Sequence, residues 1–297
     1  TGAMRTLISL ALALAAAGGA AQTPPTLAKV RSEMGIASKH DVRGQRDAVG
    51  FASTAEQMAT AWNASGPLLP EERLGAAPPP GVVAVVCPHD DYLYAGRIYK
   101  AIVPLVTART VVLVGVFHGW KRFGARDVLV LDGYRAWRTP DGELAVSPLR
   151  DELRAALPAG TAIVSAAMHD GEHSLEALAY WLHHSRPERE IVPVLVATSS
   201  FERLQTLAGQ LGAALVPALQ RRGAELGRDV AVVISSDAVH YGPDFGQVQF
   251  GDGGVEAYEK ATGRDRALLT GPLAGPVTVE KLRQAYETWV DPADPGT

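Results

Sequence analysis

Residues 82–92 read VVAVVCPHDDY, an apolar run that ends abruptly in polar residues. Two later runs end in the same way, because residues 111–116 precede His118 and residues 230–234 precede Asp237. Uninterrupted apolar residues indicate strands that are buried on both faces, as in a parallel sheet covered by helices. The chain is therefore predicted to have an α/β fold.

Short β-branched runs alternate with longer amphipathic patterns along most of the chain. Strands are expected at residues 82–86, 111–116, 128–131, 162–165, 191–196 and 230–234. Helices are expected at residues 51–64, 97–106, 148–157, 174–184, 201–220, 255–269 and 279–289. This alternation predicts a single domain with a mostly parallel central sheet flanked by helices.

A proline-rich stretch sets the expected start of that domain. Residues 75–81 read GAAPPPG, and consecutive prolines fix the backbone and remove hydrogen-bond donors. The main domain is expected at residues 81–297. Residues 22–80 are interpreted as an N-terminal arm, a helix and a linker, in which residues 22–50 have little structure of their own.

The first residues have the features of a secretory signal peptide, assigned to residues 1–21. Arg5 precedes an apolar run at residues 7–17, and small residues follow it. The run is too short to cross a bilayer as a helix. We expect export to the periplasm or beyond, with cleavage before Gln22 and no stable membrane insertion afterwards. The alternative is an N-terminal helix that is buried or disordered.

Composition excludes several classes of partner. The formal net charge is −4 and no block of like charges occurs, so neither nucleic acid nor an acidic membrane surface is an expected partner. The single cysteine, Cys87, rules out an intramolecular disulfide. It is either a small buried hydrophobic residue or a thiolate beside a metal. The chain has neither a Gly-rich phosphate loop nor a Gly-x-Ser-x-Gly elbow, which disfavours nucleotide enzymes and serine hydrolases.

Histidines follow three of the expected strands. In open α/β sheets ligands bind beyond the carboxyl ends of the strands, where His89, His118 and His240 are expected to converge. Imidazoles that meet in this way are suited to a divalent transition metal. A fourth candidate, His173, precedes a helix whose first turn could be capped by Ser174 or Asp170.

Three other histidines are weaker candidates for the site. His169 lies in a loop from which it could reach the pocket, whereas His183 and His184 lie near the end of a helix, where positive charge is favourable.

Six motifs in one order resemble the Memo family, whose bacterial and archaeal members are called AmmeMemoRadiSam system protein B. They are Pro88-His89-x-x-Tyr92-x-Tyr94-x-Gly96, Gly115-x-x-His118, Arg138-Thr139-Pro140, Glu172-His173-Ser174-Leu175-Glu176, Ile191-Val192-Pro193-Val194-Leu195-Val196 and Ser235-Ser236-Asp237-x-x-His240-Tyr241-Gly242. The resemblance covers roughly residues 81–290.

The resemblance implies the fold of class III extradiol ring-cleaving dioxygenases, which use non-haem iron(II). It implies that His89 and His118 bind the metal, and that His173, Asp237 and His240 line the same pocket as acid–base or orienting groups. The expected cofactor is iron(II), with copper or zinc as alternatives, and the substrate is an unidentified small molecule. A radical-enzyme partner is also implied, because family members are often encoded beside one.

The chain departs from the family pattern at several positions. Asp90 and Asp91 replace the usual Ala-Gly, and could supply a metal ligand or cap the next helix. Leu178 and Gly119 replace histidines of the family. The third ligand in the family is a C-terminal cysteine, and the chain ends at Thr297 before one occurs. Either the sequence is truncated at its C-terminus, which we favour, or the third ligand is different.

Three functions follow from these residues. The first is a metal-dependent, dioxygenase-like oxidoreductase, since two imidazoles and one anionic ligand leave metal positions open for dioxygen and substrate. The second is a non-catalytic metal-binding or redox factor, suggested by the lost histidines. The third is a zinc metallohydrolase, which would use the same ligands with a different metal.

Overall fold

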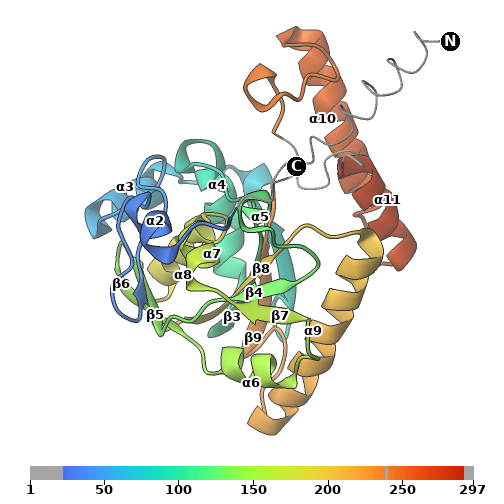
Figure 1. Ribbon diagram of the computed structural model, residues 1–297. Helices are drawn as coiled ribbons and strands as arrows, with labels where there is room; N and C mark the ends of the chain where they lie inside the picture. Colours follow the sequence, from blue (N-terminus) through green and yellow to red (C-terminus); the bar gives the residue numbers. More distant parts are fainter. Residues whose placement is uncertain (1–22, 238–239, 291–297) are drawn as a thin grey trace, which may run out of the picture.

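The computed structural model describes residues 23–237 and 240–290, and a mixed β-sheet forms its centre (Figure 1). Within these residues the sheet has nine strands: β1 (Val42–Arg43), β2 (Ala84–Cys87), β3 (Thr110–Val116), β4 (Leu129–Leu131), β5 (Ala136–Thr139), β6 (Gly142–Val146), β7 (Ala162–Val164), β8 (Glu190–Val196) and β9 (Val230–Ser235). The main path runs β1-β5-β6-β8-β3-β9-β2, and β4 joins β7 to β8 beside it.

Most neighbouring strands are parallel, as predicted. Strand β3 lies between β8 and β9 and is parallel to both, and β9 is parallel to the edge strand β2. In the described residues only β4 with β8 and β5 with β6 pair in the antiparallel sense. The carboxyl ends of β2, β3 and β9 therefore lie at one edge of the sheet.

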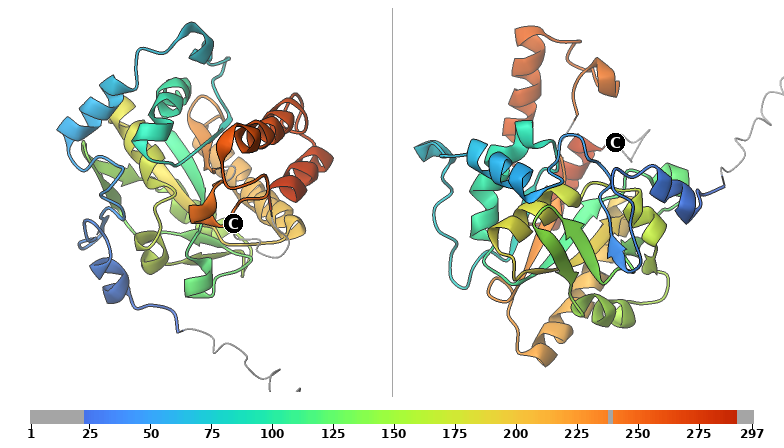
Figure 2. Two further views of the ribbon diagram at one scale, coloured as in Figure 1. Left: turned by 90° about the horizontal axis from the view of Figure 1, so that it is seen from above. Right: turned by 90° about the vertical axis from the view of Figure 1, so that its left-hand side faces the viewer.

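Helices cover both faces of this sheet, as Figures 1 and 2 show. Alternate residues of β3 enter two separate cores, Val111 and Leu113 on one face and Val112 on the other. The first core is closed mainly by α3, α4 and α8, and the second by α6 and α9. The helices are α2 (Leu27–Ser32), α3 (Ala55–Ala64), α4 (Tyr92–Ile102), α5 (Trp120–Phe123), α6 (Leu149–Ala156), α7 (Ala166–Asp170), α8 (Glu176–Ser185), α9 (Phe201–Arg222), α10 (Gly254–Thr270) and α11 (Val279–Trp289), with short 3-10 turns at Pro70–Glu72, Val103–Leu105 and Pro243–Phe245.

The two C-terminal helices lie on the opposite side of the molecule from α2 and α3 (Figures 1 and 2). Helix α11 packs on the start of α9, where Tyr286 donates a hydrogen bond to the Ser199 carbonyl at 3.1 Å and Arg283 pairs with Glu202 at 2.8 Å. Helix α10 stands away from the sheet (Figure 1). Among the described residues, no helix is long and apolar enough to cross a membrane.

The predicted lack of structure in residues 22–50 is wrong for the part that the structure describes. Helix α2 forms there, with the Thr26 side chain accepting a hydrogen bond from the Lys29 backbone N–H. Strand β1 joins the main sheet by pairing in parallel with β5. This structure could not be predicted from the sequence, because a strand of two residues is too short to show a hydrophobic periodicity. In addition, its second residue, Arg43, is charged and yet completely buried. The expected signal peptide, residues 1–21, lies outside the described residues.

Two other local expectations need correction. The helix expected at residues 97–106 begins earlier, at Tyr92, and ends at Ile102. The β5–β6 hairpin was not predicted, although its turn contains Pro140-Asp141-Gly142, which is a typical turn sequence. Its strands are short and mixed in polarity, so they lack the continuous apolar pattern that revealed the buried strands.

Candidate metal site

The register of three parallel strands sets up the site. Cys87 of β2 lies opposite Ser235 of β9, and Ser235 also lies opposite Gly115 of β3. His89, Asp237 and His118 follow these positions by only two or three residues. The predicted convergence at one edge of the sheet is therefore a direct consequence of strand register.

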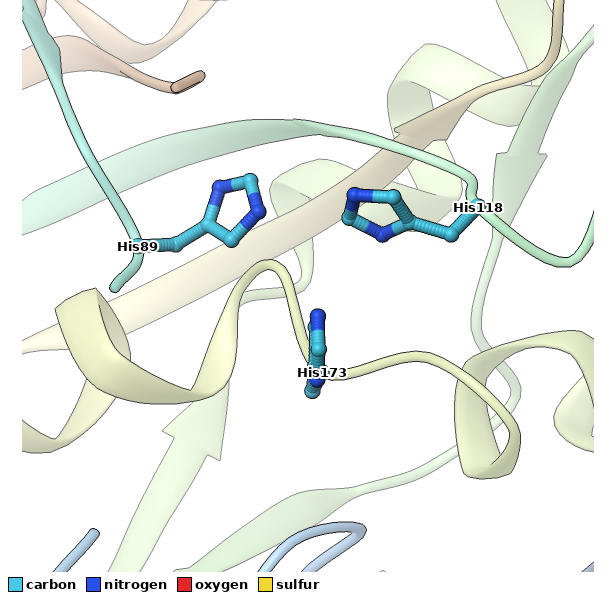
Figure 3. A group of neighbouring side chains, drawn as sticks. All are labelled: His89, His118 and His173. Atoms are coloured by element: carbon cyan, nitrogen blue, oxygen red, sulfur yellow. The ribbon is translucent and has the colours of Figure 1, made fainter. Parts of the chain in front are cut away.

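A third histidine joins His89 and His118 from the other side. His173 lies between α7 and α8, and Figure 3 shows the three imidazole rings facing one another. The ring centroids are 5.2 Å apart for His89 and His118, 5.8 Å for His89 and His173, and 5.2 Å for His118 and His173. One ring nitrogen from each residue lies within 4.8 Å of the other two, which is close enough for all three to bind one ion.

Glu172 orients His118. The Nδ1 atom of His118 lies 2.9 Å from Glu172 Oε1, and the His118 backbone N–H donates to Oε2 at 2.6 Å. Burial would raise the pKa of Glu172, but the hydrogen bond and the charge of His118 outweigh it and lower that pKa to about 2. Because the ionised carboxylate only accepts hydrogen bonds, His118 carries its proton on Nδ1 and leaves Nε2 free.

Asp47 orients His173 in a similar way. Its Oδ2 atom lies 2.5 Å from Nδ1 of His173. Burial alone would lower the pKa of His173, but the hydrogen bond with Asp47 and the negative charge of Glu172 raise it. The same hydrogen bond lowers the pKa of Asp47. In its neutral form, His173 therefore also keeps its proton on Nδ1, and Nε2 is the nitrogen left to bind a metal.

A serine hydroxyl orients His89. Ser235 Oγ lies 3.0 Å from Nδ1 of His89 and donates its own proton to the carbonyl oxygen of Ser174. Since that proton is used, Ser235 must accept the Nδ1 proton of His89, which again frees Nε2. Burial lowers the pKa of His89 to about 4, so this imidazole is neutral near pH 7.

Asp237 and His240 lie beside the three histidines. Asp237 Oδ1 accepts the backbone N–H of His89 at 2.8 Å, and its Oδ2 atom is 3.4 Å from His89 Nε2 and 3.3 Å from His240 Nε2. The His240 ring is 5.0 Å from that of Phe245, and 44% of its side chain is exposed. The pair thus connects the buried His89 to solvent.

The donor set fits a divalent transition metal. Three imidazoles that bind through Nε2 in their neutral form suit zinc, copper, iron or nickel, and an acceptor on each Nδ1 is the usual outer arrangement around such ions. The structure thus groups His173, expected as an acid–base residue, with the two expected metal-binding histidines. His240 is not a member of the group of three.

The other sequence candidates lie elsewhere. Cys87 is buried in the core, and burial raises the pKa of its thiol to about 12, so it is protonated. Asp91 precedes α4 but makes no side-chain capping bond. His169 is buried and its Nε2 donates to the Val130 carbonyl, while His183 and His184 contact Thr139 and Asp141 respectively.

Three orienting residues were not assigned by the sequence. Glu172 and Ser235 stand inside the motifs that identified the site, so their positions beside His173 and Asp237 were a usable signal. Asp47 carried no such signal, because it lies in an arm with no recognisable pattern. Only the folded chain brings it to His173.

Comparison with known proteins identifies the family of the chain. A model of the family described as "Memo-like protein" matches residues 58–280, which is more than half of the chain. The chain therefore belongs to the Memo family, as its motifs predicted. The match spans the three clustered histidines together with Asp237 and His240.

Archaeal relatives support the same assignment. A MEMO1 family protein of Thermococcus kodakarensis is 29% identical over 229 residues, covering 73% of each chain. MEMO1 family proteins of Thermococcus onnurineus and Archaeoglobus fulgidus are 30% and 32% identical, over 57% and 55% of this chain. The matched region is 56% and 57% of the length of these two relatives, so it spans little more than half of each.

Proposed function

We propose that this protein binds a divalent transition metal through His89, His118 and His173 and uses it to oxidise a small-molecule substrate. The main observation behind the proposal is that the three imidazoles have the same hydrogen-bonding arrangement. Each has its Nδ1 hydrogen-bonded to a protein acceptor, and ring nitrogens of all three approach within 4.8 Å. Iron(II) is the first choice because the motifs resemble the family related to extradiol dioxygenases, and copper is the alternative.

The surroundings of the histidines suit a catalytic rather than a purely structural ion. His89 is buried, but 41% of the His118 side chain is exposed, so the group opens to solvent on one side. When bound, the metal would supply redox or Lewis-acid chemistry at positions that the three histidines leave open. Asp237 and His240 would hold and move protons beside it, since their side chains lie 3.3 Å apart at the exposed edge.

Hydrolysis by zinc-activated water is a second candidate, and the number of histidines favours it. Three imidazoles without a carboxylate form the ligand set of some catalytic zinc sites, whereas many non-haem iron(II) oxygenases use two histidines and one carboxylate. Here Glu172 and Asp47 are hydrogen-bonded to the Nδ1 atoms of His118 and His173, and Asp237 Oδ2 is 3.4 Å from His89 Nε2. Metal identity therefore separates the two candidates.

The first experiment is elemental analysis of the purified protein and of a His89→Ala, His118→Ala double variant. We expect close to one iron or copper per chain, lost in the double variant. His184→Ala is the matched control, because His184 pairs with Asp141 rather than with the clustered histidines. Absence of metal from the unaltered protein, even after incubation with iron(II), copper and zinc, would refute the proposal.

Activity assays then separate the remaining functions. Oxygen uptake with phenolic substrates by the iron-loaded protein would support the oxidoreductase. Ester hydrolysis by the zinc-loaded protein, without oxygen uptake, would support the hydrolase. Tight metal binding with neither activity would favour a non-catalytic metal-binding or redox factor.

We also propose, on the pattern of residues 1–21, that the protein is exported. Cell fractionation with N-terminal sequencing tests this, and a cytoplasmic protein that keeps Arg5 would contradict it. The radical-enzyme partner is a proposal supported only by family resemblance. Co-purification from a native host, with the double variant as control, tests that association.

A further inference from the structure

The N-terminal arm is anchored beside the metal site by a fully buried arginine. Arg43 Nη1 lies 2.5 Å from Glu176 Oε1, and neither side chain has exposed surface. Its Nη2 donates to the carbonyl oxygens of His169 and Glu172, both at 2.6 Å. Arg43 therefore joins the arm to the segment that carries Glu172 and His173.

Glu176 also fixes the backbone that follows Arg43. Its Oε1 accepts the Arg46 N–H at 2.5 Å, and its Oε2 accepts the Asp47 N–H at 3.3 Å. A buried carboxylate that receives backbone N–H groups holds them in one geometry, since breaking such bonds would leave a buried charge without a partner. These bonds place the Asp47 side chain opposite His173.

We propose that Asp47 is a positioning residue that fixes the tautomer and orientation of His173 for metal binding. The evidence is the contact of 2.5 Å between Asp47 Oδ2 and His173 Nδ1, together with the buried anchor that holds Asp47 there. Asp47 lies outside residues 58–280, which the family model matches, so the arm adds to the site a residue beyond that match. The inference rests on the proposed metal binding through His173.

The ion pair between the Asp47 side chain and Arg46 does not account for the position of Asp47. Its Oδ1 lies 3.2 Å from Arg46 Nη1, and about a third of each side chain is exposed. Exposed ion pairs of this kind contribute little to stability. A hydrogen bond from a carboxylate to a metal-binding histidine, in contrast, commonly changes metal affinity by about 10–100-fold.

The test compares Asp47→Ala and Asp47→Asn with the unaltered full chain, using cobalt(II) as the probe. Affinity is measured by titration, and the visible absorption of bound cobalt reports ligand geometry. We expect Asp47→Ala to bind cobalt about 10–100-fold more weakly with an altered spectrum. Asp47→Asn should recover part of the loss, because its amide oxygen can still accept the Nδ1 proton. Asp41→Asn is the control, since Asp41 lies on the same arm but pairs with the exposed Arg135.

A second measurement separates positioning from folding. In the metal-free protein above pH 8, nitrogen-15 NMR of the histidine rings should show His173 protonated on Nδ1 in the unaltered chain and a mixture of tautomers in Asp47→Ala. Equal cobalt affinity and spectrum in the unaltered chain and Asp47→Ala would overturn the positioning role. Failure of the unaltered chain itself to bind cobalt would overturn the proposed function, and this inference with it.

Discussion

The carboxylate of Glu172 accepts two hydrogen bonds from His118, one from Nδ1 at 2.9 Å and one from the backbone N–H at 2.6 Å. The same carboxylate accepts the backbone N–H groups of His173 at 2.8 Å and Ser174 at 2.9 Å. One buried side chain thus fixes the ring of one proposed ligand and the backbone of another. The loop before α8 and the end of β3 are thereby held together at the site.

Replacement of Glu172 by glutamine should weaken metal binding by about 10–100-fold. The amide NH₂ would face N–H groups of His118, His173 or Ser174, so at least one hydrogen bond would be replaced by a repulsive contact. Competition with a chelator measures the affinity. Glu143→Gln is the control, because Glu143 is exposed and pairs with Arg135. Equal metal affinity in both variants would exclude the orienting role.

Replacement of Arg43 by methionine should lower the free energy of unfolding by about 3–5 kcal/mol, because it leaves the buried Glu176 carboxylate without its charged partner. Arg135→Met, which breaks the exposed pair with Asp41, should change the free energy of unfolding little. Urea denaturation of both variants gives the comparison. The double variant Arg43→Met, Glu176→Met should be more stable than Arg43→Met alone. If the double variant instead loses as much free energy of unfolding as the two single variants together, the pairing would be contradicted.

The sequence predicted the sheet well where burial alone determines the pattern. Strands β3, β8 and β9 lie at the centre and are apolar on both faces, so their residues form continuous runs. Strand β1 and the β5–β6 hairpin could not be found in this way. These strands form through contacts with residues that are distant in the sequence, such as that of Arg43 with Glu176. Such contacts leave no periodic pattern in the local sequence.

The same distinction applies to the site. His89, His118 and Asp237 could be placed together because each follows an apolar strand of the parallel part of the sheet, and the strand register aligns the ends of these strands. Burial on both faces, which the sequence predicted for residues 82–86, is wrong for β2, because β2 is a partly exposed edge strand. His173 follows no strand, so its motif marked it as functional without indicating that it would face the other two rings. Its partner Asp47 depends on the arm folding back, which is a tertiary event without a signature in the sequence.

Replacement of Ser235 by alanine should reduce metal affinity, since His89 would lose the acceptor that keeps its proton on Nδ1. We expect a loss of about tenfold, toward the low end for such groups, because a hydroxyl is a weaker acceptor than a carboxylate. The neighbouring Ser236 offers a matched control. It is exposed and its hydroxyl donates to the Asp237 carbonyl, so Ser236→Ala should bind metal normally. The orienting role would fail if the two variants had the same affinity.

The stability of the metal-free protein should decrease in acid partly because of His169. Burial lowers the pKa of this fully buried histidine from its ordinary value of 6.5 to about 3. Between these two values the unfolded chain binds the proton and the folded chain does not. The contribution of the neutral His169 imidazole to the free energy of unfolding is therefore complete above about pH 6.5. It is lost as the pH falls toward 3, at up to roughly 1.4 kcal/mol per pH unit.

His169→Gln isolates this contribution, because the glutamine amide can still donate to the Val130 carbonyl but does not titrate. Guanidinium unfolding of both proteins between pH 7.5 and pH 4 should show the stability difference shifting in favour of the variant as the pH falls. Carboxylates that titrate in the same range affect both proteins alike and cancel in the difference. Parallel stability curves would mean that His169 takes up its proton over the same pH range in the folded and unfolded chains, with the Val130 hydrogen bond sufficient to offset the cost of burying its charge.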